Sequence, residues 1–346
     1  MWQELLSALE EQKDLTESQI HFAMSEILGG RADEKNLSDF LIRLKAKGET
    51  PSEVNALVEV MYEHATLIEI PDRAVDTVGT GGDGFDTINI STSAAILTTA
   101  AGARVIKHGN RAASSKSGAA DLLEELGINI ELDAASVAEC VRKIGIGFAF
   151  APRFHPAMRH AAPVRRSLGV PTVFNILGPL ANPARPKAVA IGVARQEMFE
   201  LVAKVVANRG CEGFVFRGHE GLDEISIAGP SSVCQISEGR LIFSDFDPRE
   251  IGVERFTIES IRGGDSRKNA EITRAVFAGK DGPAREAILL NAAATIAAFK
   301  GDFHLPLENQ FANGYVLAKS AIDSGRATEL VQRWGDLSKE LAKSSL

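Results

Sequence analysis

A glycine-rich segment, GTGGDG at 79–84, follows an apolar run and precedes Asn-Ile-Ser-Thr at 89–92, where a helix is predicted to begin. The segment matches the GxGxxG pattern of dinucleotide-binding loops, which also requires an acid about 20 residues later to bind the ribose hydroxyls. Here the next expected strand ends at His108, and no acid follows it before Asp121. The spacing therefore disfavours a dinucleotide enzyme. It favours a phosphate site, because backbone N–H groups and hydroxyls converge at the positive end of the helix.

A second loop is predicted to meet the same anion. Lys107 lies in the next expected strand, and 110–118 is a loop of small and polar residues that contains Arg111 and Lys116. Loops at the carboxyl ends of adjacent strands lie at one edge of a sheet, so these two can hold one anion between them. Asp83 would repel a phosphate unless it faces ribose hydroxyls or a metal-bound water. The alternative is that Asp83 only stabilises a turn.

An acidic pair and an arginine complete the candidate chemistry. Magnesium is usually held by one or two carboxylates together with substrate phosphates and water, so Asp223 and Glu224 beside a basic cleft predict a Mg²⁺ site. A solvated surface pair is the alternative. Arg165 can bind a planar carboxylate with two parallel N–H bonds, which a lysine cannot do as well. His155 and His160 lack metal-ligand spacing, and the sequence shows no Ser-His-Asp order and no GxSxG motif.

The charge pattern also indicates an anionic ligand. The 346 residues include 38 Lys or Arg and 46 Asp or Glu, a formal net charge of −8, which disfavours a general nucleic-acid-binding protein. However, 87–120 and 140–196 contain no acid and carry four and nine basic residues. We predict that both segments line one cleft whose positive potential attracts a small phosphorylated ligand. The alternative is chance combined with helix faces of a single sign.

Composition is that of an ordinary globular protein, with 45% hydrophobic and 24% charged residues, and the length predicts roughly two domains. Cys140, Cys211 and Cys234 are far apart, which predicts neither a disulfide framework nor a zinc site. The first residues include acids where a signal peptide would carry basic residues. The longest weakly polar run, 289–299, is shorter than the roughly 18–20 residues of a membrane-spanning helix. We therefore expect a soluble cytoplasmic protein with no membrane partner.

Two patterns organise the chain. Residues 2–66 predict consecutive short helices, because Thr16-x-x-Gln19 and Thr50-x-x-Glu53 are capping boxes followed by apolar residues at helical spacing. Beyond them strands alternate with helices, which predicts a parallel or mixed sheet flanked by helices. Expected strands are 74–78, 104–108, 128–132, 146–151, 188–193 and 213–217, with a hairpin near 233–243. Expected helices are 89–101, 120–126, 133–144, 197–208, 284–299 and 314–334, and a Pro- and Gly-rich stretch, 152–186, interrupts the alternation.

Six segments together resemble the anthranilate phosphoribosyltransferase family, which is similar in fold to the pyrimidine nucleoside phosphorylases. They are GTGGDG (79–84), NIST (89–92), KHGNRAASSKSGAADLLEELG (107–127), HPAMRHAAPVRRSLG (155–169), FNILGPLANPA (174–184) and GLDEIS (221–226). The match spans essentially the whole chain. The resemblance implies a small all-helical domain, 1–70 with about 165–190, on the dimerisation and anthranilate side. It also implies a larger α/β domain, 71–164 with 191–346, in which helices flank a central mixed, mostly parallel sheet.

The same resemblance implies a glycosyltransferase (pentosyltransferase) of tryptophan biosynthesis. Such an enzyme transfers the phosphoribosyl group of 5-phospho-alpha-D-ribose 1-diphosphate (PRPP) to the amine of anthranilate, giving N-(5-phosphoribosyl)anthranilate and diphosphate. The resemblance further implies Mg²⁺ as cofactor and a homodimer, and no nucleic-acid partner. A pyrimidine nucleoside phosphorylase-like enzyme, which would bind inorganic phosphate, and a non-catalytic nucleic-acid-binding homologue, which would need an exposed basic groove, are the alternatives.

The resemblance also implies which residues of this chain form the site, because they occupy matching positions in the motifs. Contacts to PRPP are expected from Gly79, Gly82, Asp83, Thr87, Asn89, Ile90, Ser91, Thr92, Lys107, His108, Gly109, Asn110, Arg111, Ala112, Ala113, Ser114, Ser115 and Ala119. Contacts to anthranilate are expected from Gly79, Asn110 and Arg165, and magnesium contacts from Ser91, Asp223 and Glu224. Ala119 stands where the family often has serine, so only a backbone contact is expected there. A neutral aromatic amine needs little activation, so no general base is assigned, and His108 is the candidate.

Overall fold

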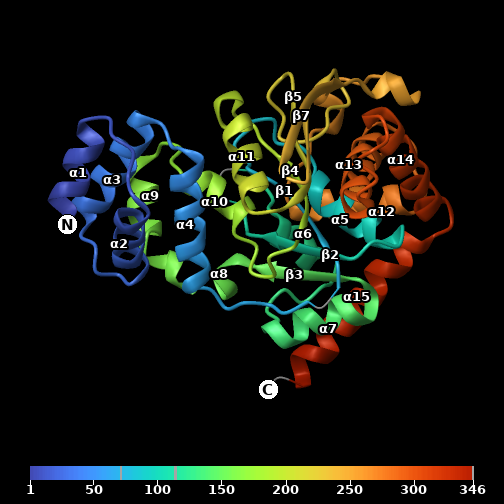
Figure 1. Ribbon diagram of the computed structural model, residues 1–346. Coiled ribbons are helices and arrows are strands. Elements are labelled where there is room, and N and C mark those ends of the chain that lie inside the picture. The colour runs from blue at the N-terminus through green and yellow to red at the C-terminus, as the bar shows by residue number, and fades with distance from the viewer. Residues whose placement is uncertain (71, 113–114, 345–346) are drawn as a thin grey trace.

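An all-helical part and a larger part built around a sheet lie side by side in this computed structural model, which describes residues 1–70, 72–112 and 115–344 (Figure 1). The all-helical part begins with α1 (Trp2–Glu10), α2 (Glu17–Leu28), α3 (Glu34–Lys47) and α4 (Pro51–Glu63). Both predicted capping boxes are present. The side chains of Thr16 and Thr50 accept the backbone N–H of the third helical residue, whose own side chain accepts the N–H of the cap. The helical start of the chain is therefore confirmed.

The larger part contains one sheet of seven strands (Figure 1). Their order is β3 (Ile146–Phe150), β2 (Val105–Gly109), β1 (Val75–Gly79), β4 (Ala188–Gly192), β5 (Glu212–Gly218), β6 (Ser231–Ser237) and β7 (Arg240–Phe246). β1 to β5 pair in parallel, and β6 is antiparallel to both of its neighbours. This confirms the mixed, mostly parallel sheet. The strand order changes direction between β1 and β4, and ligands of such sheets bind at the carboxyl ends of the strands beside that point.

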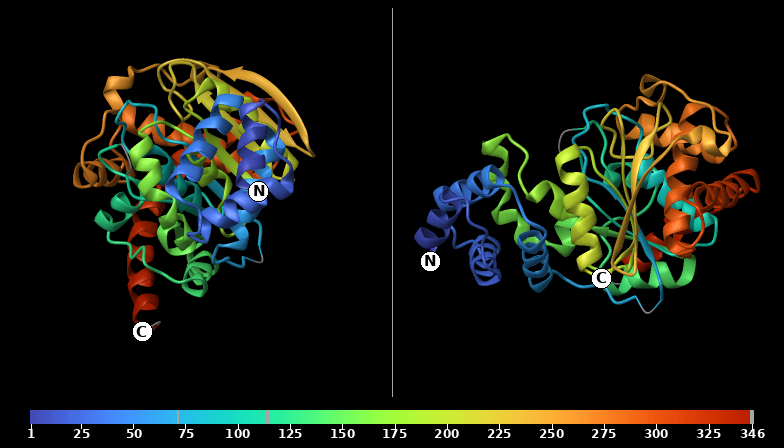
Figure 2. Two further views of the ribbon diagram at one scale, coloured as in Figure 1. Left: turned by 90° about the vertical axis from the view of Figure 1, so that its left-hand side faces the viewer. Right: turned by 45° about the horizontal axis from the view of Figure 1, so that its top comes forward.

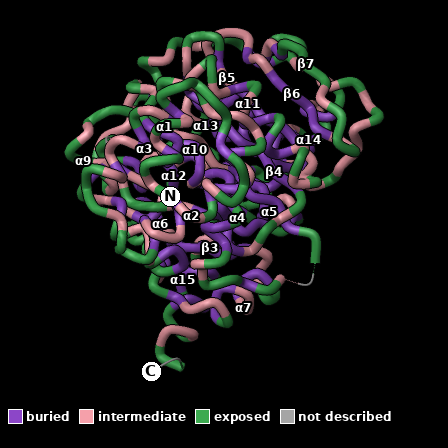
Figure 3. Tube along the Cα trace, turned by 60° about the vertical axis from the view of Figure 1, so that its left-hand side comes forward, coloured by how far each residue is buried: buried purple, intermediate pink, exposed green. Residues whose placement is uncertain are grey.

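Helices cover both faces of the sheet, so the central strands are buried (Figure 3). The helices outside the N-terminal four and the 151–180 segment are α5 (Ile90–Ala100), α6 (Ala119–Glu125), α7 (Ala134–Ile144), α11 (Gln196–Asn208), α12 (Ser266–Phe277), α13 (Pro283–Lys300), α14 (Leu307–Asp323) and α15 (Arg326–Ser344), with short 3₁₀ turns η2 (Pro248–Ile251) and η3 (Ile258–Ile261). Figure 2 shows α11 on the side of the all-helical part and α12 to α15 on the other side. In the described part of the chain no helix is long and apolar enough to cross a membrane.

The Pro- and Gly-rich stretch forms short helices that join the all-helical part. They are α8 (Ala151–Phe154), η1 (Pro156–His160), α9 (Ala162–Leu168) and α10 (Phe174–Leu180), and η1, α9 and α10 contact α2, α3 and α4. The packing differs from the predicted domain boundaries at both ends of the 165–190 segment. Residues 156–164, expected in the α/β domain, pack on the helices, whereas 188–190, expected in the helical domain, belong to β4.

Three other predictions about elements need correction. Residues 128–132 form no strand: Ile128 and Ile130 are buried in the core, and the intervening N–H of Asn129 bonds to Ser338 of α15. Their apolar alternation reflects packing, not pairing in the sheet. The predicted helix 314–334 is two helices, because Gly325 adopts a left-handed conformation (φ +76°) between α14 and α15. Helix α12 was not predicted.

Candidate active site

A cavity of about 590 Å³ lies where β1 and β2 end and α5 begins. All predicted PRPP and magnesium residues in the described part of the chain line it: Gly79, Gly82, Asp83, Thr87, Asn89, Ile90, Ser91, Thr92, Lys107, His108, Gly109, Asn110, Arg111, Ala112, Ser115, Ala119, Asp223 and Glu224. Ala113 and Ser114, also predicted, lie outside the described residues. The fold thus brings the two loops and the acidic pair into one hollow, as the sequence predicts.

The first loop bends sharply around a carboxylate. Gly81, Gly82 and Gly84 have φ values of +69°, +80° and +78°, a conformation that glycine adopts without steric cost. The N–H of Gly81 donates to Oδ2 of Asp223 at 2.6 Å. A Cβ on Gly79 would collide with the same carboxylate. The glycines therefore do more than approach a phosphate, because they also let the loop enclose Asp223.

The turn role considered for Asp83 is confirmed, while its contact with ribose hydroxyls or a metal-bound water stays a prediction. Its Oδ1 accepts the N–H of Phe85 at 3.2 Å, which is the expected turn interaction. Its charge also faces Asp223, and it raises the pKa of that carboxyl. Asp83 therefore adds negative charge to the floor of the cavity.

The acidic pair is buried, which excludes a solvated surface pair. Asp223 and Glu224 are each 8% exposed, and Glu224 accepts the N–H of Ser91 at the start of α5 at 3.1 Å. Burial and the charge of Asp83 raise the pKa of Asp223 to about 7, while burial and Asp223 raise the pKa of Glu224 well above its ordinary value. Two crowded carboxylates of this kind are stabilised by a cation.

The donor set fits magnesium as a partial site. Ser91, Asp223 and Glu224 offer oxygen atoms, the ligands that Mg²⁺ prefers. Among the described residues no three His, Cys, Asp or Glu side chains form a metal-binding group. The two carboxylates and the hydroxyl would therefore hold the ion together with water and substrate oxygens.

Lys107 carries its charge into the same cavity. It is 2% exposed, and its Nζ donates to the carbonyl of Thr77 at 2.5 Å and to Oγ of Ser91 at 3.3 Å. Burial lowers the pKa of Lys107, and the nearby carboxylates of Asp76, Glu224 and Asp223 partly oppose that change. Within the ranges that the structure describes, no carboxylate lies within ion-pair distance of this ammonium. Its charge is therefore available to an anionic ligand.

Two predicted contact residues use their side chains inside the protein. Asn89 donates to the carbonyl of Ser117 at 2.9 Å and accepts from the side chains of Ser117 and Asn269. Arg111 pairs with Asp121 and Glu124 on α6 at 2.9 and 2.6 Å. In this structure both side chains order the second loop and do not point a free group at an anion.

The prediction that the acid-free segments line one cleft is wrong in part. Lys107, Arg111, Arg159 and Arg165 do line the candidate site. Others lie elsewhere and pair with acids from outside their own segment; for example, Arg104 pairs with Asp72. A stretch without acids in the sequence is not a region without acids in space.

A second cavity, of about 540 Å³, adjoins the first and shares Gly79, His108 and Asn110 with it. Its other walls come from α8, η1, α9 and α10, and all three predicted anthranilate residues line it: Gly79, Asn110 and Arg165. The guanidinium carbon of Arg165 lies 5.2 Å from the ring centre of Phe174, and burial lowers the pKa of Arg165. No acid in the described ranges pairs with it. Apolar walls and a free guanidinium suit a flat aromatic carboxylate.

His108 stands between the two cavities as a neutral side chain. Its Nδ1 lies 2.9 Å from the carbonyl of Gly178, which can only accept, so Nδ1 carries the proton. Its Nε2 is buried and has no hydrogen-bond partner among the described residues. Burial and neighbouring His155 lower the pKa of His108 to about 3. His108 is therefore a weak base, and its unpartnered Nε2 has almost no accessible surface in this structure.

Some wall residues were not among the predicted contacts. Asn175 lines both cavities, and Phe174 and Gly178 line the second. All three belong to α10 and to the FNILGPLANPA segment. The segment itself was the available signal, but its spacing does not show which of its residues face a ligand.

Comparison with known proteins agrees with this geometry. Residues 3–65 match the helical bundle domain of a glycosyl transferase family, and 71–328 match the a/b domain of that family. Anthranilate phosphoribosyltransferase of Rhodococcus jostii (strain RHA1) is 48% identical over 343 residues, which cover 99% of this chain and 95% of that protein. The chain belongs to the anthranilate phosphoribosyltransferase family. It is therefore an enzyme of the glycosyltransferase type.

Solved structures of this family share the whole fold. The anthranilate phosphoribosyltransferase of Thermus thermophilus superposes with a TM-score of 0.90 at 36% identity, covering 97% of this chain and 99% of that one. The Saccharomyces cerevisiae enzyme in complex with PRPP and Mg superposes with a TM-score of 0.87 at 29% identity, covering 97% and 98%.

Proposed function

We propose that this protein transfers the phosphoribosyl group of PRPP to the amine of anthranilate and releases diphosphate, a step of tryptophan biosynthesis. The observation that carries the proposal is the pair of adjoining cavities. One holds Lys107 and the acidic pair beside a glycine loop, and the other holds the guanidinium of Arg165, which pairs with no acid of the described residues, between apolar walls. Structures of the S. cerevisiae enzyme contain PRPP with Mg or 4-fluoroanthranilate, which supports a donor and an acceptor of these classes.

In the first cavity the chain's own groups stabilise the leaving diphosphate. Negative charge develops on the diphosphate as its bond to the ribose carbon breaks, and Lys107 and the start of α5 offer positive charge there. Ser91, Asp223 and Glu224 would hold Mg²⁺, which supplies further positive charge to the diphosphate when bound. Because the sequence and the fold place these groups before substrate arrives, little reorganisation is needed during the reaction.

In the second cavity the chain positions the acceptor. Arg165 binds the carboxylate of anthranilate, and the amine then lies toward His108, whose ring lines this cavity. The pKa of His108 is about 3, so it orients the amine and does not store the proton as a strong base would. Orientation of the two reactants is therefore the larger contribution of this side.

We also propose a homodimer formed through the all-helical part and a cytoplasmic location. Ile42 on α3 is 48% exposed, an apolar group available for subunit contact. Cys140, Cys211 and Cys234 are free thiols, which suits a reducing compartment. Light scattering on the purified protein measures the subunit number, and a monomeric mass contradicts the dimer.

The direct test mixes the protein with anthranilate, PRPP and Mg²⁺ and follows the loss of anthranilate fluorescence. We expect the signal to fall only when all three are present, with one diphosphate released per anthranilate consumed. A matched assay with thymidine or uridine and inorganic phosphate tests the nucleoside phosphorylase alternative. Phosphorolysis without loss of anthranilate would overturn the proposal.

A further inference from the structure

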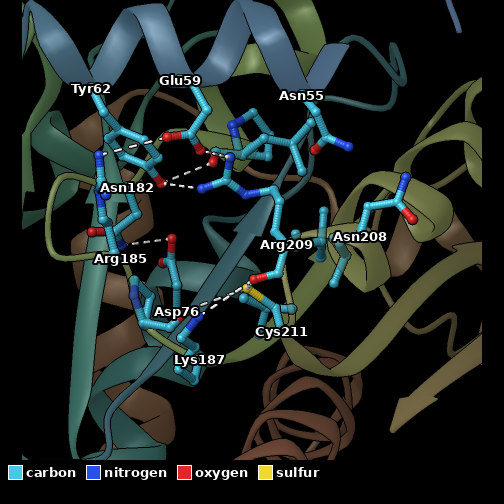
Figure 4. A pocket seen from close by; sticks show the side chains of 16 residues that line it. Asn55, Glu59, Tyr62, Asp76, Asn182, Arg185, Lys187, Asn208, Arg209 and Cys211 are labelled. Carbon is cyan, nitrogen blue, oxygen red and sulfur yellow. Dashed lines mark hydrogen bonds and ion pairs between the residues drawn. The ribbon is translucent and has the colours of Figure 1, made fainter. Parts of the chain in front are cut away.

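A buried acid outside the predicted site joins two strands of the sheet where they diverge. Asp76, the second residue of β1, is 1% exposed, and Figure 4 shows its carboxylate pointing toward Asn182. Strands β1 and β2 pair at one position only, Val75 with Val105, whereas β1 and β4 pair at five. Side chains, not backbone groups, therefore join the carboxyl halves of β1 and β2.

Three hydrogen bonds fill that gap. Oδ1 of Asp76 accepts the backbone N–H of His108 at 3.2 Å, and Oδ2 accepts Nδ2 of Asn182 at 2.8 Å. The same Nδ2 donates to the carbonyl of Ile106 at 2.9 Å. The backbone on both sides of Lys107 is thus held by one carboxylate–amide pair, which we call the Asp76–Asn182 clamp.

The clamp and the ring of His108 reach the same segment. Asn182 follows α10 closely, and the Nδ1 proton of His108 goes to the carbonyl of Gly178 within α10. One tie fixes the backbone of His108 and the other fixes its imidazole. Together they fix the place of the His108 ring in the wall that the two cavities share, since a shift of either anchor would turn the ring or change its tautomer.

Asp76 and Asn182 line a further cavity of about 320 Å³, which Figure 4 shows. Its arginines are engaged by the protein. Arg209 donates to Glu59 at 3.1 Å and to the hydroxyl of Tyr62 at 2.8 Å, and Arg185 lies 4.1 Å from the centre of the Tyr62 ring. These contacts hold α4 against the end of α11, where Arg209 lies, and against Arg185 in the chain that follows α10. Their arrangement indicates a rigid wall for the clamp and not a binding site.

We propose that Asp76 is a positioning residue for the acceptor half of the reaction: with Asn182 it holds His108 in place in the wall that the two cavities share. This inference rests on the proposed function. Asp76 lines neither cavity of the candidate active site, so its effect passes through two neighbours, His108, whose N–H it accepts, and Lys107, whose charge it faces. Burial raises the pKa of Asp76 to about 6, so an ionised carboxyl at this position opposes folding, as expected of a group kept for function.

The test variant is Asp76→Asn. Its single oxygen can accept from His108 or from Asn182 but not from both, and its new amide faces another donor. We expect the KM for anthranilate to rise about tenfold, the loss of one hydrogen bond to a charged group, with the KM for PRPP changed less than about threefold. Asn182→Ala, which keeps Asp76 and its bond to His108, should raise the KM for anthranilate by a smaller factor. It also tests the clamp if Asp76→Asn does not fold.

Glu53→Gln is a matched control. Glu53 is also 1% exposed and accepts two backbone N–H groups, those of Leu15 and Thr50, each at 2.8 Å, but it lies in the all-helical part. We expect this control to lower the melting temperature and to leave both KM values unchanged. If Asp76→Asn also only lowers the melting temperature, Asp76 is merely structural and the proposal is overturned.

A readout independent of turnover separates this proposal from the proposed function. Nitrogen-15 NMR of the histidine side chains reports which ring nitrogen carries the proton. We expect the Nδ1–H form of His108 in the wild type and a mixture of tautomers in Asp76→Asn. An unchanged His108 spectrum in Asp76→Asn overturns the clamp. A wild type that shows the expected spectrum but does not consume anthranilate contradicts only the proposed function.

Discussion

Two lysines with little-exposed side chains, one in each part of the molecule, differ in how their charges are paired. In the all-helical part, Nζ of Lys47 lies 2.8 Å from both Asp14 and Glu53. Burial lowers the pKa of Lys47, but hydrogen bonds to these two carboxylates more than offset it, so the pKa is raised. At the carboxyl ends of the strands, Lys107 donates to a carbonyl and a hydroxyl and, among the described residues, pairs with no acid, and burial lowers its pKa.

The carboxylates of the two parts differ in the same way. Glu53 accepts two backbone N–H groups and faces Lys47. Asp223 and Glu224 each accept one N–H and face each other, and both pKa values are raised. A buried ion is tolerated when its partners are complete, and it costs stability when they are not. The incomplete pairing at the sheet edge therefore marks the place where a ligand supplies the missing charge.

Removing the acidic pair should give the largest effect. Asp223→Asn with Glu224→Gln keeps the shape of the site but cannot hold a divalent cation. We expect kcat/KM with saturating Mg²⁺ to fall roughly 1000-fold, since a bound ion contributes several kcal/mol to charge stabilisation. Steady-state kinetics across a Mg²⁺ titration measures this, and a variant that stays within tenfold of the wild type and still responds to Mg²⁺ contradicts the assignment.

The same pair predicts a pH-dependent stability. The pKa of Asp223 is raised from an ordinary 3.8 to about 7, so the folded protein retains a proton that the unfolded chain releases. The stability from that proton is complete below about pH 4 and is lost as the pH rises through 7. As the pH rises across this window, we expect the double variant to become more stable than the metal-free wild type. The difference in the free energy of unfolding should be on the order of 2–4 kcal/mol at pH 8. Urea unfolding from pH 4 to 8 checks this, and a difference independent of pH contradicts it.

Replacing the two lysines should separate function from stability. We expect Lys107→Met to lower kcat/KM by about 10- to 150-fold, the value of one charge-assisted hydrogen bond, with little loss of stability. Lys47→Met leaves Glu53 without its cation and should lose about 3 kcal/mol of stability while the activity of the folded fraction is unchanged. Kinetics and chemical unfolding on both variants measure these effects. Equal kinetic losses would show that pairing does not distinguish the two sites.

Local signals in the sequence predicted much of the fold and of the site. The capping boxes at Thr16 and Thr50 act within one helical turn, so they could be found without knowing the fold. The glycine loop and the acidic pair were also found, because each is a short run of unusual residues beside a strand. Ile128 and Ile130 misled the prediction, since burial against α15 gives the same alternation as pairing in a sheet.

Interactions between distant segments could not be read in this way. The acids that pair with Arg111 are 10 and 13 residues away. Others lie just outside an acid-free segment, as Glu139 does for Arg142, or in another part of the chain, as Asp72 does for Arg104, so the charge pattern overstated the positive cleft. The sequence contains one signal for Asp76, because it is the only acid in the strand segment Val75–Val78. A buried strand excludes an acid unless other groups pair with it, but the sequence does not show that Asn182, 106 residues away, is the partner.

The smallest effect concerns two arginines that both lie over aromatic rings. Arg209 lies 5.0 Å from the centre of Tyr62 and also pairs with Glu59, whereas Arg165 lies 5.2 Å from Phe174 and, among the residues described, has no acid partner. Arg165→Ala should therefore raise the KM for anthranilate about tenfold and leave the KM for PRPP unchanged, because one carboxylate contact of about 1.4 kcal/mol is lost. Arg165→Lys retains the charge without the paired N–H groups, so its KM for anthranilate should lie between those of the wild type and Arg165→Ala. Arg209→Ala should change stability alone, since its partners belong to the protein. Fluorescence-based kinetics on the three variants decides the matter: if Arg165→Ala raises both KM values equally, Arg165 acts on the shape of the site and not on the carboxylate of the acceptor.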